Sequence, residues 1–518
     1  MKKIIAIIAS AAMLFSLVSC GGNKDTVSSD TQSEQTMYSP IDVSALDTTK
    51  VQITKVPEDL FPEATTFDAP FVAPMAPGKS QAKDIDGDGV IRIACMGDSI
   101  TEGGADSNWP LFLQEYLNFL GQTDGNTYEV KNFGKAGSAV KHVLEETDGN
   151  QDGTINEGGE YFLYDDPRYV ESLTYKADLV IVQHGANDGL GGTVGVPAAE
   201  GSNAGTLEDY FINDYTEYLI KPYVTNGAQV VISTPTYCSN GYVDSYVNGW
   251  ISEAVRQMAK AYGLQCVDLN KVTQPRRESL PDGVHGNTSG YKLMAQTYAN
   301  QIFGMELSTV TFKAQPGSEI EMGIHMTTVR SEGIGTINLL KGLEDKGSFD
   351  MSLVCKDYKP VKDTVNVDGS ATFEYNLERT YNLAVGKTVT ASSTQLNDDG
   401  TSNPPEQAVD GDYNTRWESQ FKDGQWFVVD LGQNYKVNGV NIWWEGAYAS
   451  KYKLSVSTDG ENYTEVATVE IAKEGLASTL FTECDASYVK FECITRASNK
   501  FGCSFYEFQV LSDYDPAA

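Results

Sequence analysis

Between about Asp88 and Phe303 the chain alternates short apolar runs with longer amphipathic segments, and this alternation restricts its possible folds more than any other feature. β-type runs that alternate with helical segments are typical of a sheet whose parallel strands are connected by helices. We therefore predict an α/β doubly wound domain with a parallel core. The expected strands are 90–95, 127–133, 178–184, 228–233 and 264–268, and the expected helices are 109–120, 167–174, 207–221, 246–262 and 288–302.

The first expected strand ends in Gly97-Asp98-Ser99, where the apolar run changes abruptly into small and polar residues. Ligands of doubly wound sheets bind at the carboxyl ends of the strands, so Ser99 is a candidate nucleophile. A serine hydroxyl is a weak nucleophile unless a neighbouring base removes its proton and N–H donors stabilise the oxyanion that forms.

The base must be sought among only four histidines. His285 follows Asp282 by three residues on a glycine-containing turn, so the carboxylate can hold Nδ1–H and leave Nε2 free to act as the base. His184 is expected to pack near the pocket or to contact substrate. We interpret His142 and His325 as structural or exposed.

Two other predicted strand ends offer donors for an oxyanion. Gly137 lies just beyond the 127–133 strand, and Asn187 lies just beyond the 178–184 strand. Together with the N–H of Ser99, the N–H of Gly137 and the side-chain amide of Asn187 would make three donors. Taken singly, Asn187 could be a helix cap and Asp282 a turn residue. Their position at one edge of the sheet favours a catalytic site.

Four segments of this region resemble the sequence blocks of the SGNH hydrolases, also called GDSL esterases. The resemblance implies a flavodoxin-like three-layer fold and a triad of Ser99, His285 and Asp282. It also implies that Gly137 and Asn187 are oxyanion donors and that catalysis uses no cofactor. Gly286 departs from the pattern, since the family often has proline after the histidine. The blocks are Gly97-Asp98-Ser99-Ile100-Thr101, Gly134–Gly137, Gly185-Ala186-Asn187-Asp188 and Asp282-Gly283-Val284-His285.

The composition excludes one class of partner. With 71 acidic and 38 basic residues in 518, the net charge is −33. A surface so acidic repels phosphate backbones, and we therefore expect no nucleic-acid partner.

The first residues have the pattern of a secretory signal. Met1-Lys2-Lys3 precedes an apolar run, Ile4–Val18, that is short for a membrane span. Leu17-Val18-Ser19-Cys20 resembles a bacterial lipobox, which implies that Cys20 is lipidated and anchors the chain in the outer membrane or at the cell surface. The alternative is an ordinary signal peptide with an incidental cysteine. Seven of the eight cysteines then remain, an odd number that does not indicate a disulfide framework.

Two acidic loops are candidate calcium sites. Asp148, Asn150 and Asp152 match the first liganding positions of an EF-hand loop. Its twelfth position is Gly159, although Glu157 or Glu160 could substitute, so the loop is either a Ca²⁺ site or a solvated turn. The loop Asp84–Gly89 shares the opening pattern and could complete a site with another loop.

Residues 306–380 contain short alternating runs separated by glycines and charged turns, which predict a small antiparallel β domain. We interpret this domain as a spacer. Its expected strands lie within Ser308–Lys313, Ser348–Cys355 and Thr364–Asn376.

Residues 381–513 are again β-rich and resemble the discoidin or coagulation-factor type C module, a β-sandwich of jelly-roll type whose bacterial relatives mostly bind carbohydrate. The resemblance rests on four segments, and it implies a structural Ca²⁺ bound by Asp410, Asp412, Thr415 and Glu507. The aromatic residues that could form a platform for sugar stacking are Trp443, Trp444, Tyr448, Phe421 and Phe501. The segments are Asn382-Leu383-Ala384, Ala408–Trp417, Trp426–Gly432 and Ser457-Thr458-Asp459-Gly460.

These features predict a secreted, lipid-anchored serine esterase that removes O-acetyl or similar acyl groups from a polysaccharide or glycan. The alternatives are a non-catalytic glycan-binding surface protein and a lipase or acyl-thioesterase of the SGNH type. The predicted organisation is a signal peptide (1–20), a flexible tether (21–81), a hydrolase domain (82–305), a β-rich spacer (306–380) and a carbohydrate-binding module (381–513).

Overall fold

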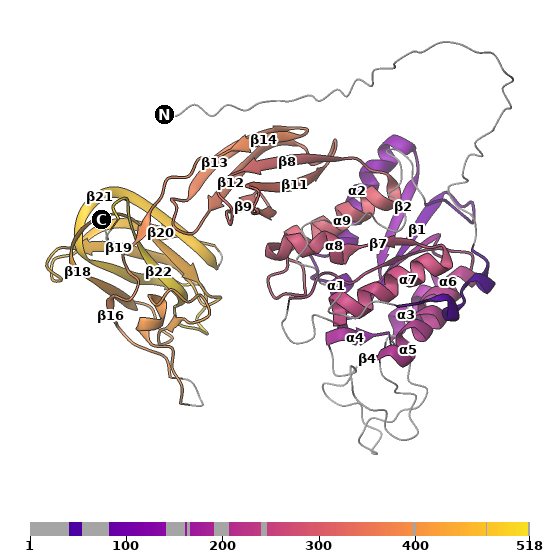
Figure 1. Ribbon diagram of the computed structural model, residues 1–518, viewed down its shortest axis with the longest axis horizontal. Coiled ribbons are helices and arrows are strands. Elements are labelled where there is room, and N and C mark those ends of the chain that lie inside the picture. Colours follow the sequence, from indigo (N-terminus) through magenta and orange to yellow (C-terminus); the bar gives the residue numbers. More distant parts are fainter. Residues whose placement is uncertain are drawn as a thin grey trace, which may run out of the picture. The chain divides into compact units, whose positions relative to one another are not determined.

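A computed structural model describes residues 41–53, 82–140, 161–162, 166–190, 207–239, 246–396, 400–472 and 474–515 (Figure 1). The chain divides into two compact units. The first runs to Met351 and includes Asp363–Glu374, and the second comprises Ser352–Lys362 and Tyr375–Ala518. Within the described ranges, no helix is both long and apolar enough to cross a membrane.

The first unit is built around a five-stranded sheet in the order β2-β1-β5-β6-β7, with every pair of neighbours parallel. Numbered along the sheet's own chain order this is 2-1-3-4-5, the flavodoxin-like arrangement. The prediction of a doubly wound parallel sheet is therefore confirmed. The strands are β1 (Val90–Gly97), β2 (Thr127–Asn132), β5 (Leu179–Gln183), β6 (Gln229–Ser233) and β7 (Gln265–Val267).

Helices cover both faces of this sheet (Figure 1). Side chains of α2 and α9 form one core with β1, and side chains of α3, η5 and α7 form the other. α2 begins after the cap Asn108, whose side chain accepts from Leu111 N, and ends at the left-handed Gly125. The helices are α1 (Ser99–Glu102), α2 (Trp109–Asp124), α3 (Pro167–Thr174), α4 (Ala186–Leu190), α5 (Leu207–Asp214), η5 (Tyr215–Ile220), α6 (Lys221–Thr225), η6 (Tyr246–Ile251), α7 (Ser252–Tyr262), α8 (Leu269–Thr273), η7 (Gln274–Ser279) and α9 (Thr288–Phe303).

Some details differ from the sequence-based expectation. The expected helix 207–221 continues to Thr225 and contains a π-helical stretch, η5. The helix expected from residue 246 likewise opens with a π-helical turn, η6. Eight short elements of this unit were not predicted. They are α1, α4, α8 and η7, together with η1 (Val43–Ala45), η2 (Thr48–Lys50), β3 (Ser138–Ala139) and β4 (Tyr161–Phe162).

The next strands form two small sheets, β10-β9-β12-β13 and β11-β8-β14. The prediction of a wholly antiparallel domain is wrong for one pair, since β14 lies parallel to β8. The expected strand Thr364–Asn376 is interrupted at Gly369, which has a φ of +79°, so the chain leaves one sheet and joins the other. The strands are β8 (Leu307–Lys313), β9 (Glu319–Met322), β10 (His325–Thr328), β11 (Ile334–Leu340), β12 (Lys346–Val354), β13 (Val361–Asp368) and β14 (Ala371–Glu374).

The second unit contains an antiparallel β-sandwich, as the sequence predicts. Its core is aromatic, with Trp417, Phe427 and Phe505 packed at ring-centroid distances of 4.9 to 5.2 Å. The long strand β18 pairs with both β21 and β22. The elements are β15 (Tyr381–Asn382), β16 (Thr388–Ala391), η8 (Pro405–Ala408), β17 (Trp417–Glu418), β18 (Trp426–Trp444), β19 (Ala449–Ser457), β20 (Thr464–Glu470), β21 (Gly475–Arg496) and β22 (Ser504–Ser512).

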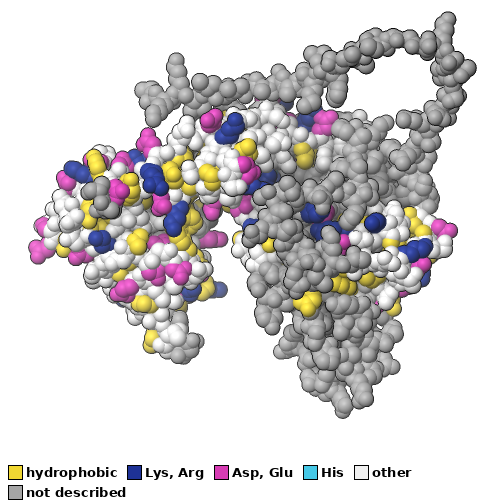
Figure 2. Space-filling view, viewed as in Figure 1, with side chains coloured by type: hydrophobic (Ala, Val, Ile, Leu, Met, Phe, Trp, Pro, Cys, Tyr) yellow, Lys and Arg dark blue, Asp and Glu magenta, His cyan; other side chains and the backbone are white. Residues whose placement is uncertain are grey.

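On the face drawn in Figure 2, acidic and basic side chains are interspersed over the described surface. Lysines and arginines there lie singly among acidic residues rather than in one continuous stripe.

Candidate active site

Ser99 is the first residue of α1, directly beyond the end of β1. The turn between them is tight, because a Cβ at Gly97 would lie 2.1 Å from Thr101 Oγ1. Asp98 caps α1 by accepting a hydrogen bond from Ile100 N at 2.9 Å. Its burial raises the pKa of this carboxyl to about 6. The turn therefore presents Ser99 at the carboxyl edge of the sheet, with its N–H at a helix start.

The structure brings the three predicted triad residues together. Ser99 Oγ lies 2.8 Å from His285 Nε2, and His285 Nδ1 lies 2.7 Å from Asp282 Oδ2. Asp282 Oδ1 also accepts from the backbone N–H groups of Val284 and His285. Burial raises the pKa of Asp282, but the hydrogen bonds from His285 and Val284 outweigh it, so the pKa lies below its ordinary value. Asp282 therefore stays ionised and holds the imidazole with Nε2 toward the serine.

The predicted oxyanion donors converge on the same edge. Gly137 is exposed and has a φ of +77°. Residues other than glycine adopt this backbone conformation only at a cost in free energy. Among the described residues, no acceptor is bonded to the N–H of Gly137 or of Ser99. Asn187 Nδ2 donates to Ser138 O at 3.0 Å, which uses one of its two hydrogens and leaves the other available.

His184 packs against the segment that carries Gly137, and its role there is structural. Its Nδ1 accepts from Gly185 N at 3.1 Å, so the proton is on Nε2, which donates to Ser138 Oγ at 3.2 Å. Ser138 Oγ in turn donates to Lys135 O at 2.7 Å. Burial lowers the pKa of His184 to about 3, so the ring stays neutral. Of the two roles left open for His184, the structure shows the packed one.

Three further residues hold the loop and were not predicted. Asp188 accepts from Val140 N through both carboxylate oxygens, at 3.0 and 3.1 Å. Glu102 accepts from Ala136 N at 2.7 Å and from Arg168 Nη1 at 2.8 Å. Arg168 Nη1 also donates to Gly134 O. Asp188 is part of a recognised block, but nothing in the sequence indicates that Arg168 contacts Glu102.

The acidic loop of the β-sandwich lies beside a buried carboxylate. Thr415 Oγ1 donates to Asp410 Oδ2 at 2.8 Å, and Glu507 Oε1 accepts from Gly411 N at 2.5 Å. Glu507 is fully buried, and its Oε2 has no hydrogen-bond partner among the described residues. Burial, with the charges of Asp410 and Asp412, raises its pKa to about 7. An unpartnered buried oxygen beside exposed carboxylates is a donor set that fits a hard cation.

Of the remaining candidate lipidation and calcium sites, the structure describes only the loop Asp84–Gly89. Cys20 and the loop with Asp148, Asn150 and Asp152 lie outside the described residues. In the loop Asp84–Gly89, the carboxylates of Asp84 and Asp86 gather with that of Asp178. Asp178 accepts from Ile85 N and Arg92 N at 2.7 and 2.8 Å. Since these bonds account for the shape of the loop, we assign it no ion.

The aromatic pool of the sandwich separates into core and surface. Trp444 is buried in the core, and Tyr448 donates to Ala472 O at 2.7 Å. Trp443 is partly buried against Tyr413. Phe421 and Phe501 are 46% and 51% exposed, and their ring centroids lie 6.4 Å apart.

The loop that carries Phe501 is braced by charged groups. Arg496 Nη1 donates to Phe501 O at 2.6 Å, and Arg496 Nε donates to Asp423 Oδ1 at 2.9 Å.

Comparison with known families identifies two domains in the chain. A model of the GDSL-like lipases/acylhydrolases matches residues 93–297, and a model of the F5/8 type C domain matches residues 388–508. The chain thus contains a GDSL-type hydrolase domain followed by an F5/8 type C domain, which confirms both resemblances.

Particular relatives include a multidomain esterase of Ruminococcus flavefaciens, 26% identical over 262 residues that make up 45% of this chain and 30% of that protein. An acetylxylan esterase of Xylanibacter ruminicola is 26% identical over 232 residues, 41% of this chain and 43% of that protein. The chain therefore spans less than half the length of either relative. A solved chitosan-binding module from Paenibacillus sp. IK-5 is 38% identical, over 26% of this chain and all of that module, with a TM-score of 0.24.

Proposed function

We propose that the GDSL-type domain is a carbohydrate esterase that uses Ser99 as its nucleophile. His285 Nε2 takes the proton of Ser99 Oγ as that oxygen attacks the acyl carbon, and Asp282 stabilises the imidazolium that forms. The contact of 2.8 Å between Ser99 Oγ and His285 Nε2 is the observation that carries this proposal. His285 then protonates the departing sugar oxygen, which leaves an acyl group on Ser99.

The same residues complete the cycle. His285 activates a water that attacks the acyl-enzyme, and the acid and Ser99 are released. In both halves the carbonyl oxygen becomes negative, next to the N–H groups of Ser99 and Gly137 and the amide of Asn187. One such donor contributes about a hundredfold or more to the rate.

We propose that the ester is an O-acetyl group on a polysaccharide. The printed names of two relatives, an acetylxylan esterase and a multidomain esterase, support this substrate class. The exposure of the triad supports it too. The side chains of His285 and Asp282 are 42% and 56% exposed, which suits a bulky polymer better than an acyl chain enclosed in an apolar tunnel.

For the F5/8 type C domain we propose binding to the same polysaccharide. Sugar rings stack on exposed aromatic faces, and Phe421 and Phe501 offer two such faces close together. We also propose that Asp410, Asp412, Thr415 and Glu507 hold a structural Ca²⁺, which would supply charge compensation to the buried Glu507.

The location of the enzyme is proposed from the amino-terminal pattern. Lipidation of Cys20 would anchor it in the outer membrane or at the cell surface, where polymeric glycans are accessible.

The test is acetate release from a panel of acetylated plant and host polysaccharides by residues 21–518, with Ser99→Ala as the control. We expect release from at least one polymer by the wild type, and about a 10⁴-fold or greater loss in the variant. If the wild type binds a glycan but releases no acetate from any polymer, the result would favour a non-catalytic glycan-binding protein. Release of long-chain acids instead of acetate would favour a lipase.

A further inference from the structure

The triad residues Asp282 and His285 lie on one loop, residues 280–287, which we call the triad loop. It connects η7 to α9. The two ends of the loop are tied to each other, since Asn287 N donates to Ser279 O at 3.0 Å and Asn287 Nδ2 donates to Glu278 O at 3.2 Å. Any shift of these ends therefore moves the base and its carboxylate relative to Ser99.

β10, from the domain interpreted as a spacer, contacts both ends of the triad loop. On the α9 side, Met326 N donates to Ser289 Oγ at 3.0 Å. On the η7 side, Thr328 Oγ1 donates to Glu278 Oε2 at 3.2 Å. β10 is therefore bonded to the segments before and after the two catalytic residues.

Arg276 makes the most extensive of these contacts. Its Nη1 donates to Thr327 Oγ1 of β10 at 2.5 Å and to the carbonyl oxygen of Thr336 in β11. Its Nη2 donates to Thr336 Oγ1 at 2.9 Å. The backbone of η7 is kinked at this residue, with φ −124° and ψ 43°. One guanidinium thus joins the segment before the triad loop to two strands of the small β domain.

This arginine is energetically costly where it lies. Burial lowers the pKa of Arg276, and the nearby charge of Glu278 offsets this only in part. The hydrogen-bond partners of the guanidinium are threonine oxygens and a carbonyl. An apolar side chain of similar size would avoid the cost of burying a charge. The arginine does, however, orient η7. Its planar guanidinium donates to β10 and β11 in a fixed geometry, which sets the angle between η7 and these strands.

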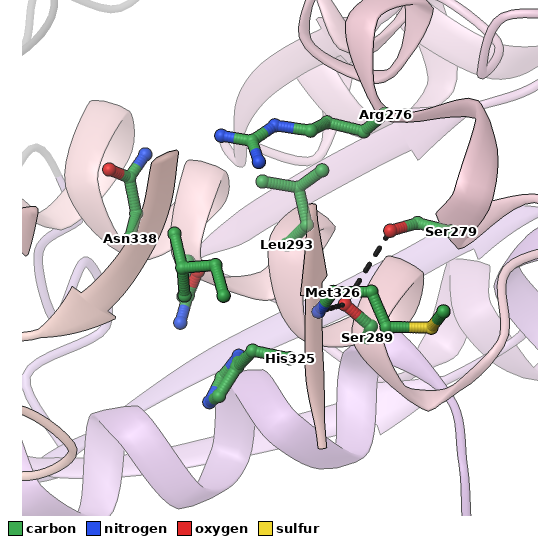
Figure 3. Close-up of a pocket in the computed structure, with 9 residues that line it drawn as sticks. Arg276, Ser279, Ser289, Leu293, His325, Met326 and Asn338 are labelled. Carbon is green, nitrogen blue, oxygen red and sulfur yellow. Dashed lines mark hydrogen bonds between the residues drawn. The ribbon is translucent and has the colours of Figure 1, made fainter. Parts of the chain in front are cut away.

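The interface between α9 and the β strands is not close-packed throughout. A cavity of about 20 Å³, lined by Arg276, Ser279, Ser289 and Asn338 among others, lies between α9 and the β strands. Figure 3 shows Arg276 at the top, Ser279, Ser289 and Met326 close together toward the right, and Asn338 at the left. Such a space is large enough for a water molecule. Around it, the hydrogen bonds of Arg276, Ser289 and Glu278 connect the segments on either side of the triad loop to the β strands.

We propose that Arg276 is a positioning residue and that β10 and β11 form a brace that holds His285 and Asp282 against Ser99. The inference rests on the proposed esterase function. It means that the small β domain is part of the catalytic unit and does more than separate two domains.

The test compares kcat and KM of the full chain on 4-nitrophenyl acetate, a small soluble ester that needs no polysaccharide contact. Arg276→Met keeps the length and removes the donors. A displacement of the triad by about an ångström costs about tenfold to a hundredfold in rate, so we expect kcat to fall by that amount while KM changes little. Arg276→Lys keeps a positive charge with hydrogen-bond donors, and we expect its kcat to lie between that of the wild type and that of Arg276→Met.

Tyr116→Phe is the matched control. It removes a hydrogen bond from Tyr116 Oη to Glu344 Oε1, 2.9 Å long, between α2 and the same β domain but away from the triad loop. We expect a similar loss of thermal stability with kcat unchanged. If Arg276→Met does not fold, Ser289→Ala decides, because it removes the acceptor of Met326 N at the other end of the loop.

A folded Arg276→Met or Ser289→Ala with the wild-type kcat overturns the inference, as does an equal fall of kcat in Tyr116→Phe. Failure of the proposed function has a different signature: the wild type itself would then hydrolyse no ester.

Discussion

The buried carboxylate of Glu507 makes a prediction about calcium and pH. In the absence of a cation, the charged form of Glu507 is disfavoured by burial and by Asp410 and Asp412, and its pKa rises from the ordinary 4.5 to about 7. A folded-state pKa above the unfolded one means that the folded module binds more protons between those values. Ionisation of Glu507 therefore does not destabilise the module below about pH 4.5, and the destabilisation grows as the pH rises to about 7.

The size of this effect follows from the shift. A rise from 4.5 to about 7 corresponds to at most about 3 kcal/mol at neutral pH, or a thermal midpoint lower by roughly 10 °C in a module of this size. Ca²⁺ bound to the carboxylate would remove this penalty. Glu507→Gln removes the charge, so we expect the chelated variant to be more stable than the chelated wild type at pH 8.

Differential scanning calorimetry of the full chain measures this, with EDTA or with excess Ca²⁺, from pH 5 to pH 8. We expect Ca²⁺ to raise the midpoint of the sandwich transition in the wild type but not in Glu507→Gln. Asp459→Asn is the control, because Asp459 lies in another acidic turn of the module and should leave the Ca²⁺ response intact. A chelated midpoint that is independent of pH and identical in wild type and Glu507→Gln would refute the reasoning.

Three other predictions concern separate parts of the chain. Asn187→Ala should lower kcat on a soluble acetyl ester by about a hundredfold or more, and a loss below about threefold would exclude its amide as an oxyanion donor. Phe421→Ala combined with Phe501→Ala should weaken binding to insoluble polysaccharide in a pull-down and leave the rate on the soluble ester unchanged; unaltered binding would place the sugar site elsewhere. Cys20→Ala should move the protein from the membrane fraction to the soluble fraction, since the predicted anchor is its acyl chains. Retention in membranes after a salt wash would require another anchor.

The sheet could be predicted from the sequence because its central strands are largely apolar runs, such as Leu179–Gln183, that end abruptly in glycine and polar residues. The triad could be predicted because its base and carboxylate, His285 and Asp282, are close in sequence. Both signals are local, and a parallel sheet places strand ends together by its topology.

The supports of the site could not be predicted, because they join residues that are distant in sequence. Arg168 reaches Glu102 across 66 positions, and Arg276 reaches Thr336 across 60. No periodicity records such a pairing. The spacer interpretation failed to anticipate the contacts of β10 for the same reason, and β10 itself (His325–Thr328) was not among the strands expected from the sequence. Glu507 could be assigned to the acidic loop only through the family resemblance.

The central claim is that His285 activates Ser99, and covalent labelling tests it most directly. A fluorophosphonate reacts with a serine hydroxyl only when a base assists and the oxyanion is stabilised. Peptide mapping by mass spectrometry should find one adduct, on Ser99, and the labelling rate should fall by about a hundredfold or more in His285→Ala. A wild-type enzyme that hydrolyses esters without acquiring a label on Ser99, or a His285→Ala variant that is labelled as fast as the wild type, would contradict the account.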